Sequence, residues 1–146
     1  MRNKFSNNYP IINLYNKKSA VSKIVTQMLY GENFTVLRKF RNWYKIKLHT
    51  DNYVGFINRK KFTNPLKPTH KVSVLAANVY GKHSNKAKQN KKLTFASKIY
   101  AKEKYGSFTK FENRWIKTKD LKPINYKDKN IFSKICLFEE RKYKWG

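Results

Sequence analysis

The chain has 146 residues, 40% of them hydrophobic and 16% aromatic, and a net charge of +26 from 34 Lys and Arg against 8 Asp and Glu. This aromatic content excludes an intrinsically disordered chain and predicts a packed core. One cysteine excludes an internal disulfide, and no stretch approaches the roughly 18 apolar residues of a membrane span or has the apolar segment of a secretory signal, so we expect a cytoplasmic, non-membrane protein.

Two explanations of the positive charge stay open. A basic surface is typical of proteins that bind nucleic acid or another polyanion. An AT-rich genome would also enrich the chain in lysine, whatever its function. The 28 Lys against 6 Arg favour this second explanation, because phosphate recognition usually prefers the bidentate guanidinium of Arg. We therefore do not expect a nucleic-acid partner.

The first half of the chain reads as short strands after a polar tail at residues 1–8. The strand candidates are YPIINLY (9–15), ENFTVLRKF (32–40), WYKIKLH (43–49) and YVGFI (53–57). In the third of them Tyr44, Ile46 and Leu48 alternate with Lys45, Lys47 and His49, which predicts a strand with one buried face. Thr50-Asp51-Asn52 predicts the hairpin turn that follows, and Gly55 a bulge or bend.

One segment gives conflicting signals. Val21, Ile24, Val25, Met28 and Leu29 have the spacing of an amphipathic helix, so SAVSKIVTQMLY (19–30) could be a short helix by local pattern.

The second half resembles a weak repeat of the first. Phe34-Thr35-Val36 matches Leu93-Thr94-Phe95, and Phe56-Ile57 matches Trp115-Ile116, both at an offset of 59 residues (93 − 34 and 115 − 56). A repeat of this length predicts two copies of one small unit, and about 60 residues is the size of an SH3-like barrel. TNPLKPTH (63–70), with two prolines, predicts the joint between them.

After Pro123 the pattern changes to that of a short helix. Its apolar positions are Ile131, Phe132, Ile135, Cys136 and Phe138. Two turns of amphipathic helix do not fold alone, so this segment needs a partner surface.

The residues carry no recognisable catalytic or metal-binding constellation. Cys136 lies on the apolar face of the predicted helix, where a thiol is usually inert, and three scattered histidines make no zinc pattern. We expect no cofactor and no metal. RKFRNWYKIK (38–47) interleaves bases with aromatics as single-strand nucleic-acid platforms do. The alternative, which the alternation favours, places Phe40, Trp43 and Tyr44 in the barrel core with the lysines facing water.

Three segments in order resemble NlpC-type cysteine peptidases of the bacterial cell wall. Gln27 to Ile57, with its Leu-Tyr-Gly-Glu turn, Trp-led strand and Asp-Asn-Tyr-Val-Gly, resembles their first bacterial SH3-like domain. This resemblance implies an extended or turn conformation into Gly31, and we prefer it to the short helix that the local pattern suggests. Thr69 to Tyr100 and Arg114 to Ile124 resemble the second. NIFSKICLFEERKYKWG (130–146) resembles the first helix of the peptidase domain and its Tyr-x-Trp-Gly turn.

The resemblance implies an all-β fold of two tandem SH3-like barrels, followed by a short C-terminal α-helix that begins a truncated α+β papain-like domain. The implied domains are 9–64, 65–124 and the start of the peptidase domain at 125–146. The family's nucleophilic Cys lies beyond Tyr143, and its histidines further on. We therefore expect no catalytic residue in this chain.

The resemblance also implies a function. Such enzymes are endopeptidases that cleave γ-D-glutamyl-diamino acid bonds in short murein-derived peptides, and their first SH3-like domain narrows the substrate pocket. By motif position the pocket candidates are Tyr143, Glu32 and Tyr53, and the partners are a murein peptide and the chain's own catalytic domain. For Glu32 a plain turn residue, and for Tyr53 a core strand residue, are the alternatives. A basic SH3-like module that binds nucleic acid or murein on its own is the alternative function.

Overall fold

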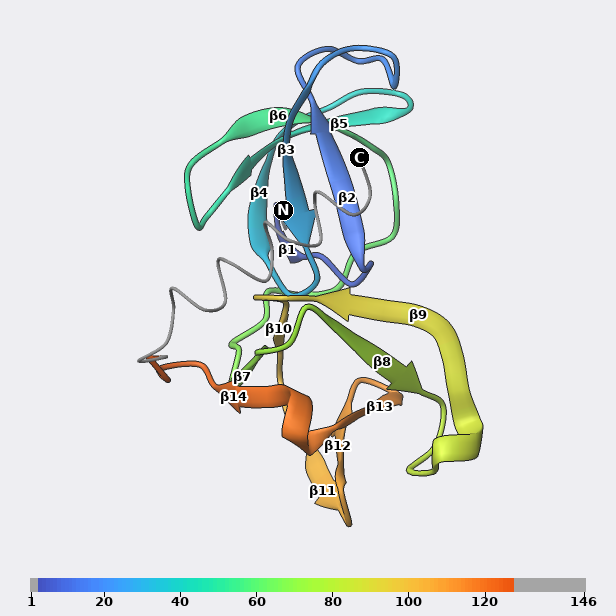
Figure 1. Ribbon diagram of the computed structural model, residues 1–146. Coiled ribbons are helices and arrows are strands. Elements are labelled where there is room, and N and C mark those ends of the chain that lie inside the picture. The colour runs from blue at the N-terminus through green and yellow to red at the C-terminus, as the bar shows by residue number, and fades with distance from the viewer. Residues whose placement is uncertain (1–2, 128–146) are drawn as a thin grey trace.

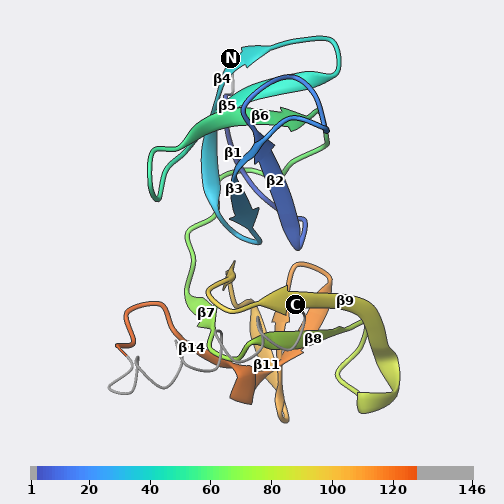
Figure 2. The same ribbon diagram turned by 45° about the horizontal axis from the view of Figure 1, so that its top comes forward.

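The computed structural model describes residues 3–127, which form an all-β structure of two units joined by a linker (Figures 1 and 2). Within these residues no helix has the length and apolar character needed to cross a membrane. The first unit is one six-stranded sheet in the order β1-β4-β5-β6-β2-β3. Its strands are β1 (Lys4–Ser6), β2 (Ile11–Tyr15), β3 (Ile24–Leu29), β4 (Asn33–Lys39), β5 (Trp43–Leu48) and β6 (Val54–Asn58).

The second unit contains two sheets, in the orders β10-β7-β14 and β11-β12-β13-β8-β9. Its strands are β7 (His70–Val72), β8 (Ala76–Tyr80), β9 (Lys88–Thr94), β10 (Lys98–Ile99), β11 (Glu103–Tyr105), β12 (Phe108–Phe111), β13 (Arg114–Lys117) and β14 (Leu121–Pro123). Two short 3-10 turns, η1 (Asn85–Ala87) and η2 (Thr118–Asp120), lie between strands.

The alternation predicted in the first unit is confirmed. Ile46 and Leu48 of β5 are buried in the core, Tyr44 packs against it, and Lys47 between them is exposed. The other fully enclosed core side chains come from β2, β3, β4 and β6. Each strand therefore gives one face to a single interior, as a small barrel requires.

The helix-like spacing before Gly31 is overruled by strand pairing. Residues 24–29 form β3, which pairs antiparallel with β2 from Ile11↔Leu29 to Tyr15↔Ile24. Of the five apolar residues at helix spacing, only Met28 is fully buried, whereas Val21 is 96% exposed. The extended conformation that the resemblance implies for this segment is therefore confirmed, and local periodicity alone would have been misleading because a partner strand satisfies the backbone.

The polar tail expected at residues 1–8 is corrected by the structure, since residues 4–6 form β1 and pair with β4. Asn7 is buried too, because its amide nitrogen donates to the carbonyls of Met28 and Leu29, both at 3.1 Å. A polar residue tolerates burial when its hydrogen bonds are made. Composition alone does not reveal such bonds.

The two units repeat one another in their hydrogen bonds. Gly31 N donates to Asn7 O at 2.8 Å, and Ala96 N donates to Val72 O at 3.0 Å, an offset of 65 residues (96 − 31). The pair Ile12↔Met28 recurs as Ala77↔Leu93 at that offset. Two copies of one barrel are therefore present.

The repeat corrects one sequence match and supports the other. Phe34 pairs with Phe5 as Ile99 pairs with His70, so Ile99, not Leu93, is the counterpart of Phe34. The match of Phe56 to Trp115 is right, because the pair Tyr15↔Phe56 recurs as Tyr80↔Trp115. The offset falls from 65 (80 − 15) to 59 (115 − 56) because the segment between these points is shorter in the second copy.

The linker is held against the first barrel by a bridge between Ser6 and Thr63 and by the side chain of Asn33. The amide nitrogen of Asn33 donates to Leu66 O at 2.8 Å, and Leu66 N donates to Asn33 Oδ1 at 2.9 Å. A bidentate contact of this kind fixes the direction in which the chain leaves one barrel for the other.

Candidate functional site at the junction of the barrels

The turn between β3 and β4 holds the two barrels together. It runs from Leu29 to Glu32, with Glu32 N donating to Leu29 O at 3.2 Å and Gly31 at a φ of 83°. Figure 1 shows this turn against β10. A Cβ added at Gly31 would lie 1.9 Å from the carbonyl oxygen of Lys98, so the turn approaches the second barrel closely only because the residue is glycine.

Tyr30 enters the core of the second barrel. It is 3% exposed, and its ring meets that of Phe111 edge-on at 5.6 Å. Its hydroxyl donates to Glu112, and Lys98 N donates to Tyr30 O at 2.9 Å. Burial, and next the contact with Glu112, raise the pKa of the Tyr30 phenol far above its usual value. The phenol therefore stays neutral and acts as a structural anchor.

Glu32 follows directly and is a half-buried turn residue. Its Oε2 accepts a hydrogen bond from Leu29 N at 2.7 Å, and Thr50 lies nearby. Burial raises the pKa of Glu32 and nearby Asp51 adds to the rise, although the Leu29 amide and Lys98 oppose it. Glu32 is thus a turn residue, which was the alternative considered for it. Its carboxyl is also partly removed from solvent and lies near the carboxyl of Asp51.

Tyr53 lies in the same neighbourhood through the loop that connects β5 to β6. Its amide donates to Asp51 Oδ1 at 3.2 Å, and Asn52 before it has a φ of 61°. The Tyr53 side chain is 49% exposed and precedes β6. The interpretation of Tyr53 as a core strand residue is therefore wrong, because the turn leaves its ring on the surface.

This corner of the first barrel suits a cationic group. Asp51 helps to raise the pKa of Glu32 while Lys98 lowers it, and a further ammonium beside Glu32 would favour the ionised carboxylate. The Tyr53 phenol is exposed and can donate or accept a hydrogen bond. The chemistry offered is recognition of a primary amine.

The third candidate, Tyr143, lies outside the described residues, as do Cys136 and the helix predicted around it. Sequence analysis missed Tyr30, although it stood in the same Leu-Tyr-Gly-Glu segment. An aromatic residue directly before a turn glycine was the available indication. This pattern does not indicate that the aromatic ring packs into the second barrel.

The interpretation of RKFRNWYKIK needs a partial correction. Tyr44 packs against the core as expected, but Phe40 and Trp43 are half-buried and belong to no core cluster. Lys18 lies 4.1 Å and Arg38 5.0 Å from the Phe40 ring, and Trp43 meets Tyr15 edge-on. Trp43 points away from the core because it lies three residues before buried Ile46 in the same strand. Phe40 lies outside that strand, and its ring is 6.1 Å from the ring of Phe56.

The fold is that of SH3-like barrels, and one family model is similar to the first of them. Residues 14–62 match the family model of the bacterial dipeptidyl-peptidase SH3 domain. A search of the curated proteins returned no match.

Among solved structures, the chain is similar to an NlpC/P60 family protein from Bacillus cereus ATCC 10987, with a TM-score of 0.68 and 16% identity. The match covers 87% of this chain and 57% of that one, so the chain spans a little more than half of that protein. The family model and the shared fold support the resemblance to the SH3-like region of an NlpC-type peptidase.

Proposed function

We propose that this chain is the non-catalytic, substrate-gating module of a murein-peptide hydrolase. The parent enzyme would be a cysteine endopeptidase of γ-D-glutamyl-diamino acid bonds, acting in the cytoplasm on short peptides. Its nucleophile and histidines would come from a catalytic domain joined to this module. The Glu32 corner would form one wall of the substrate pocket, and Tyr143 another.

One observation carries the proposal. The Glu32 carboxyl is half-buried, is held in place by Leu29 N at 2.7 Å, and is destabilised as an anion by burial and by Asp51. A short peptide has one group that such a site prefers, its free N-terminal ammonium, because a charge-assisted hydrogen bond to a partly desolvated carboxylate is strong. A gate of this kind admits peptides with a free amine and rejects longer or blocked ones.

The proposal is tested by titrating the ¹⁵N-labelled chain with L-Ala-γ-D-Glu-L-Lys. We expect amide shifts at Glu32, Thr50 and Tyr53. The same peptide acetylated at its N-terminus is the control and should leave them unchanged. Glu32→Gln should weaken binding about fivefold, since it removes one charged partner of the hydrogen bond. Equal shifts with both peptides, or shifts confined to other residues, would contradict the proposal.

The enzymatic part has its own test. The reading frame should continue into an Asp-Cys-Ser-Gly motif within about thirty codons, the spacing that the resemblance implies. A stop codon with no such motif would remove the hydrolase. Cell fractionation tests the compartment, and recovery of the protein outside the cytoplasm would contradict that part.

A stand-alone nucleic-acid-binding module is a second candidate. The observation that favours it is the outer face with Lys18 and Arg38 over Phe40, in a chain with a net charge of +26. Binding would show a steep fall in affinity with salt. Fluorescence anisotropy with a single-stranded RNA at low salt decides this, because an unchanged signal removes the candidate.

A further inference from the structure

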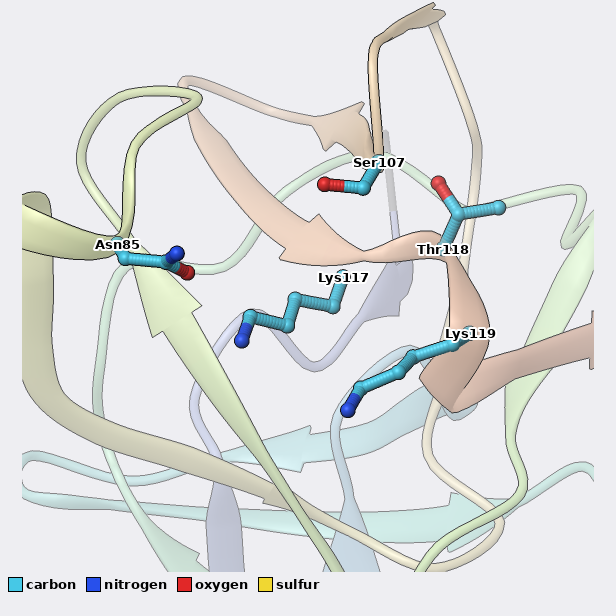
Figure 3. Close-up of a pocket in the computed structure, with 5 residues that line it drawn as sticks. All are labelled: Asn85, Ser107, Lys117, Thr118 and Lys119. Carbon is cyan, nitrogen blue, oxygen red and sulfur yellow. The ribbon is translucent and has the colours of Figure 1, made fainter.

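A hollow on the second barrel shares no residue with the Glu32 corner. Its volume is about 300 Å³, and it is lined by Asn85, Ser107, Lys117, Thr118 and Lys119 (Figure 3). Asn85 belongs to η1, Ser107 to the turn before β12, and the other three to the junction of β13 with η2. Three separate segments therefore converge on it.

The lining is cationic and rich in hydrogen-bond donors. Neither Lys117 nor Lys119 makes an ion pair within residues 3–127, where the single one recorded joins Lys110 to Glu103. In Figure 3 both lysine side chains leave the β13–η2 segment on the side of Asn85. Burial raises the pKa of neighbouring Asp120, and the two lysines oppose that rise. An added anion would therefore meet two ammonium groups that carry no direct counter-ion there.

The first barrel has a longer side chain at the position equivalent to one of these lining residues. At the offset of 59 residues established by the pair Phe56 and Trp115, Thr118 corresponds to Arg59 (118 − 59). Arg59 Nη1 donates to the carbonyls of Phe40 at 3.1 Å and Arg41 at 3.4 Å. Its guanidinium also lies 5.0 Å from the Tyr44 ring. The side chain thus bridges one strand end to the facing hairpin.

Thr118 is too short to make that bridge. Its hydroxyl instead lies 2.7 Å from that of buried Thr109, and its amide donates to Ser107 O at 2.9 Å. At this position the first barrel therefore has a side chain that crosses to the facing hairpin, and the second barrel has one that does not.

We propose that this hollow binds the oxyanion of a small hydroxylated acid, such as a sugar carboxylate or sugar phosphate. The volume is at the low end of small-molecule sites, which fits one sugar-sized ligand. Two ammonium groups suit a carboxylate or phosphate, while Ser107 and Asn85 suit hydroxyls.

The test uses the ¹⁵N-labelled chain and four probes: glucuronate, glucose 6-phosphate, inorganic phosphate and neutral glucose. We expect both sugar acids to shift the amides of Asn85, Ser107 and Lys119, and glucose to leave them unchanged. Binding by the sugar acids but not by inorganic phosphate supports recognition of the sugar body. Binding of inorganic phosphate alone overturns the sugar part of the proposal.

Variants distinguish specific binding at the hollow from nonspecific attraction of anions to a basic protein. Lys119→Met should weaken binding about fivefold, the effect of losing one charged hydrogen bond. Lys92→Met removes the same charge from an exposed position on β9 and should have no effect. Thr118→Arg places a much longer side chain in the lining and should abolish binding by filling the hollow. Thr118→Arg also removes the hydrogen-bond partner of Thr109 and could unfold the chain. In that case the comparison of Lys119→Met with Lys92→Met still tests the proposal.

Two results would overturn the proposal. Equal weakening by Lys119→Met and Lys92→Met would show nonspecific attraction. If neither sugar acid shifted these amides and only an oligonucleotide did, the lysines would belong to a polyanion-binding surface instead. Neither result bears on the Glu32 corner, whose test uses a peptide and different amides.

Discussion

The Glu32 side chain combines a structural and an electrostatic role, and the two can be separated by substitution. Its folded pKa is raised above the usual 4.5 by burial, so the folded state holds the proton more tightly than the unfolded chain. The stabilisation from this group is therefore complete below pH 4.5 and is lost as the pH rises through the raised folded pKa.

We therefore expect Glu32→Gln to flatten the dependence of unfolding free energy on pH as the pH rises from 4.5 through the raised folded pKa. The amide keeps an acceptor for Leu29 N, so its stability at pH 7 should equal or slightly exceed that of the wild type. Glu32→Ala loses the acceptor and should lose about 1 kcal/mol. Urea unfolding at several pH values measures this. A steeper wild-type gain toward neutral pH than in Glu32→Gln would contradict it.

The Tyr30 hydroxyl makes a second prediction at this scale. Tyr30→Phe keeps the ring beside Phe111 but leaves Glu112 without its donor, so we expect a loss of about 1 kcal/mol. Tyr100→Phe, at a position 48% exposed, is the matched control and should change nothing measurable. Guanidinium unfolding followed by fluorescence gives both values. Equal effects would mean that the contact with Glu112 contributes nothing.

At the scale of elements, equivalent turns in the two barrels use different residues. Gly31 and Ala96 occupy corresponding positions with φ values of 83° and 73°. Gly31→Ala adds left-handed strain and a clash with Lys98, so we expect a loss of roughly 3 kcal/mol or more. Gly106→Ala, at a φ of 56° with nothing within 4 Å, should lose about 1 kcal/mol.

Ala96→Gly completes this comparison. It removes the left-handed strain at Ala96, and we expect unfolding free energy to stay level or rise by up to about 1 kcal/mol, after the entropy of glycine is counted. A loss at Ala96→Gly, or equal losses at Gly31→Ala and Gly106→Ala, would show that close approach does not govern these turns. Thermal unfolding of the four proteins measures the differences.

Strands could be predicted where apolar and polar residues alternate in the sequence. Prediction failed where a partner strand distant in sequence determines the conformation. Ile46 and Leu48 identify β5 because one face of that strand meets the core. The segment ending at Met28 looked helical because only β2, distant in sequence, satisfies its backbone. Residues 4–6 were missed because three residues are too few for periodicity, and their role depends on β4.

The candidate site was predicted only in part, for the same reason. Glu32 and Tyr53 came from motif position, but the proximity of Asp51 and Thr50 to Glu32 depends on how the β5–β6 loop folds back. Tyr30 was missed because its contacts are with a second copy of the barrel. The hollow beside Lys117 has no motif, since its lining comes from three separate segments of the chain.

At the scale of the whole molecule, the two barrels share a residue. Tyr30 comes from the first and lies in the core cluster of the second, so each barrel is less stable without the other. We expect a single unfolding transition for the wild type and two separate transitions for Tyr30→Ala, which removes a buried ring worth about 3–5 kcal/mol. Calorimetry resolves them, and two transitions in the wild type would show that the barrels are independent.

Charge acts on the same scale. The chain carries a net charge of +26, and within the described residues one ion pair, Lys110 to Glu103 at 3.7 Å, is recorded. Like charges repel more in a compact state than in an extended one, so folding works against this repulsion. Added salt screens charges that lie farther apart than about 10 Å at 0.1 M.

We therefore expect the melting temperature to rise with salt, by roughly 3–5 °C between 20 and 300 mM sodium chloride, which corresponds to about 1 kcal/mol in a chain of this size. Sodium chloride and potassium chloride should act alike, because screening depends on ionic strength alone. A melting temperature that stays constant or falls with salt would mean that attractive contacts outweigh the repulsion. In that case the lysine side chains would make attractive contacts that stabilise the folded chain.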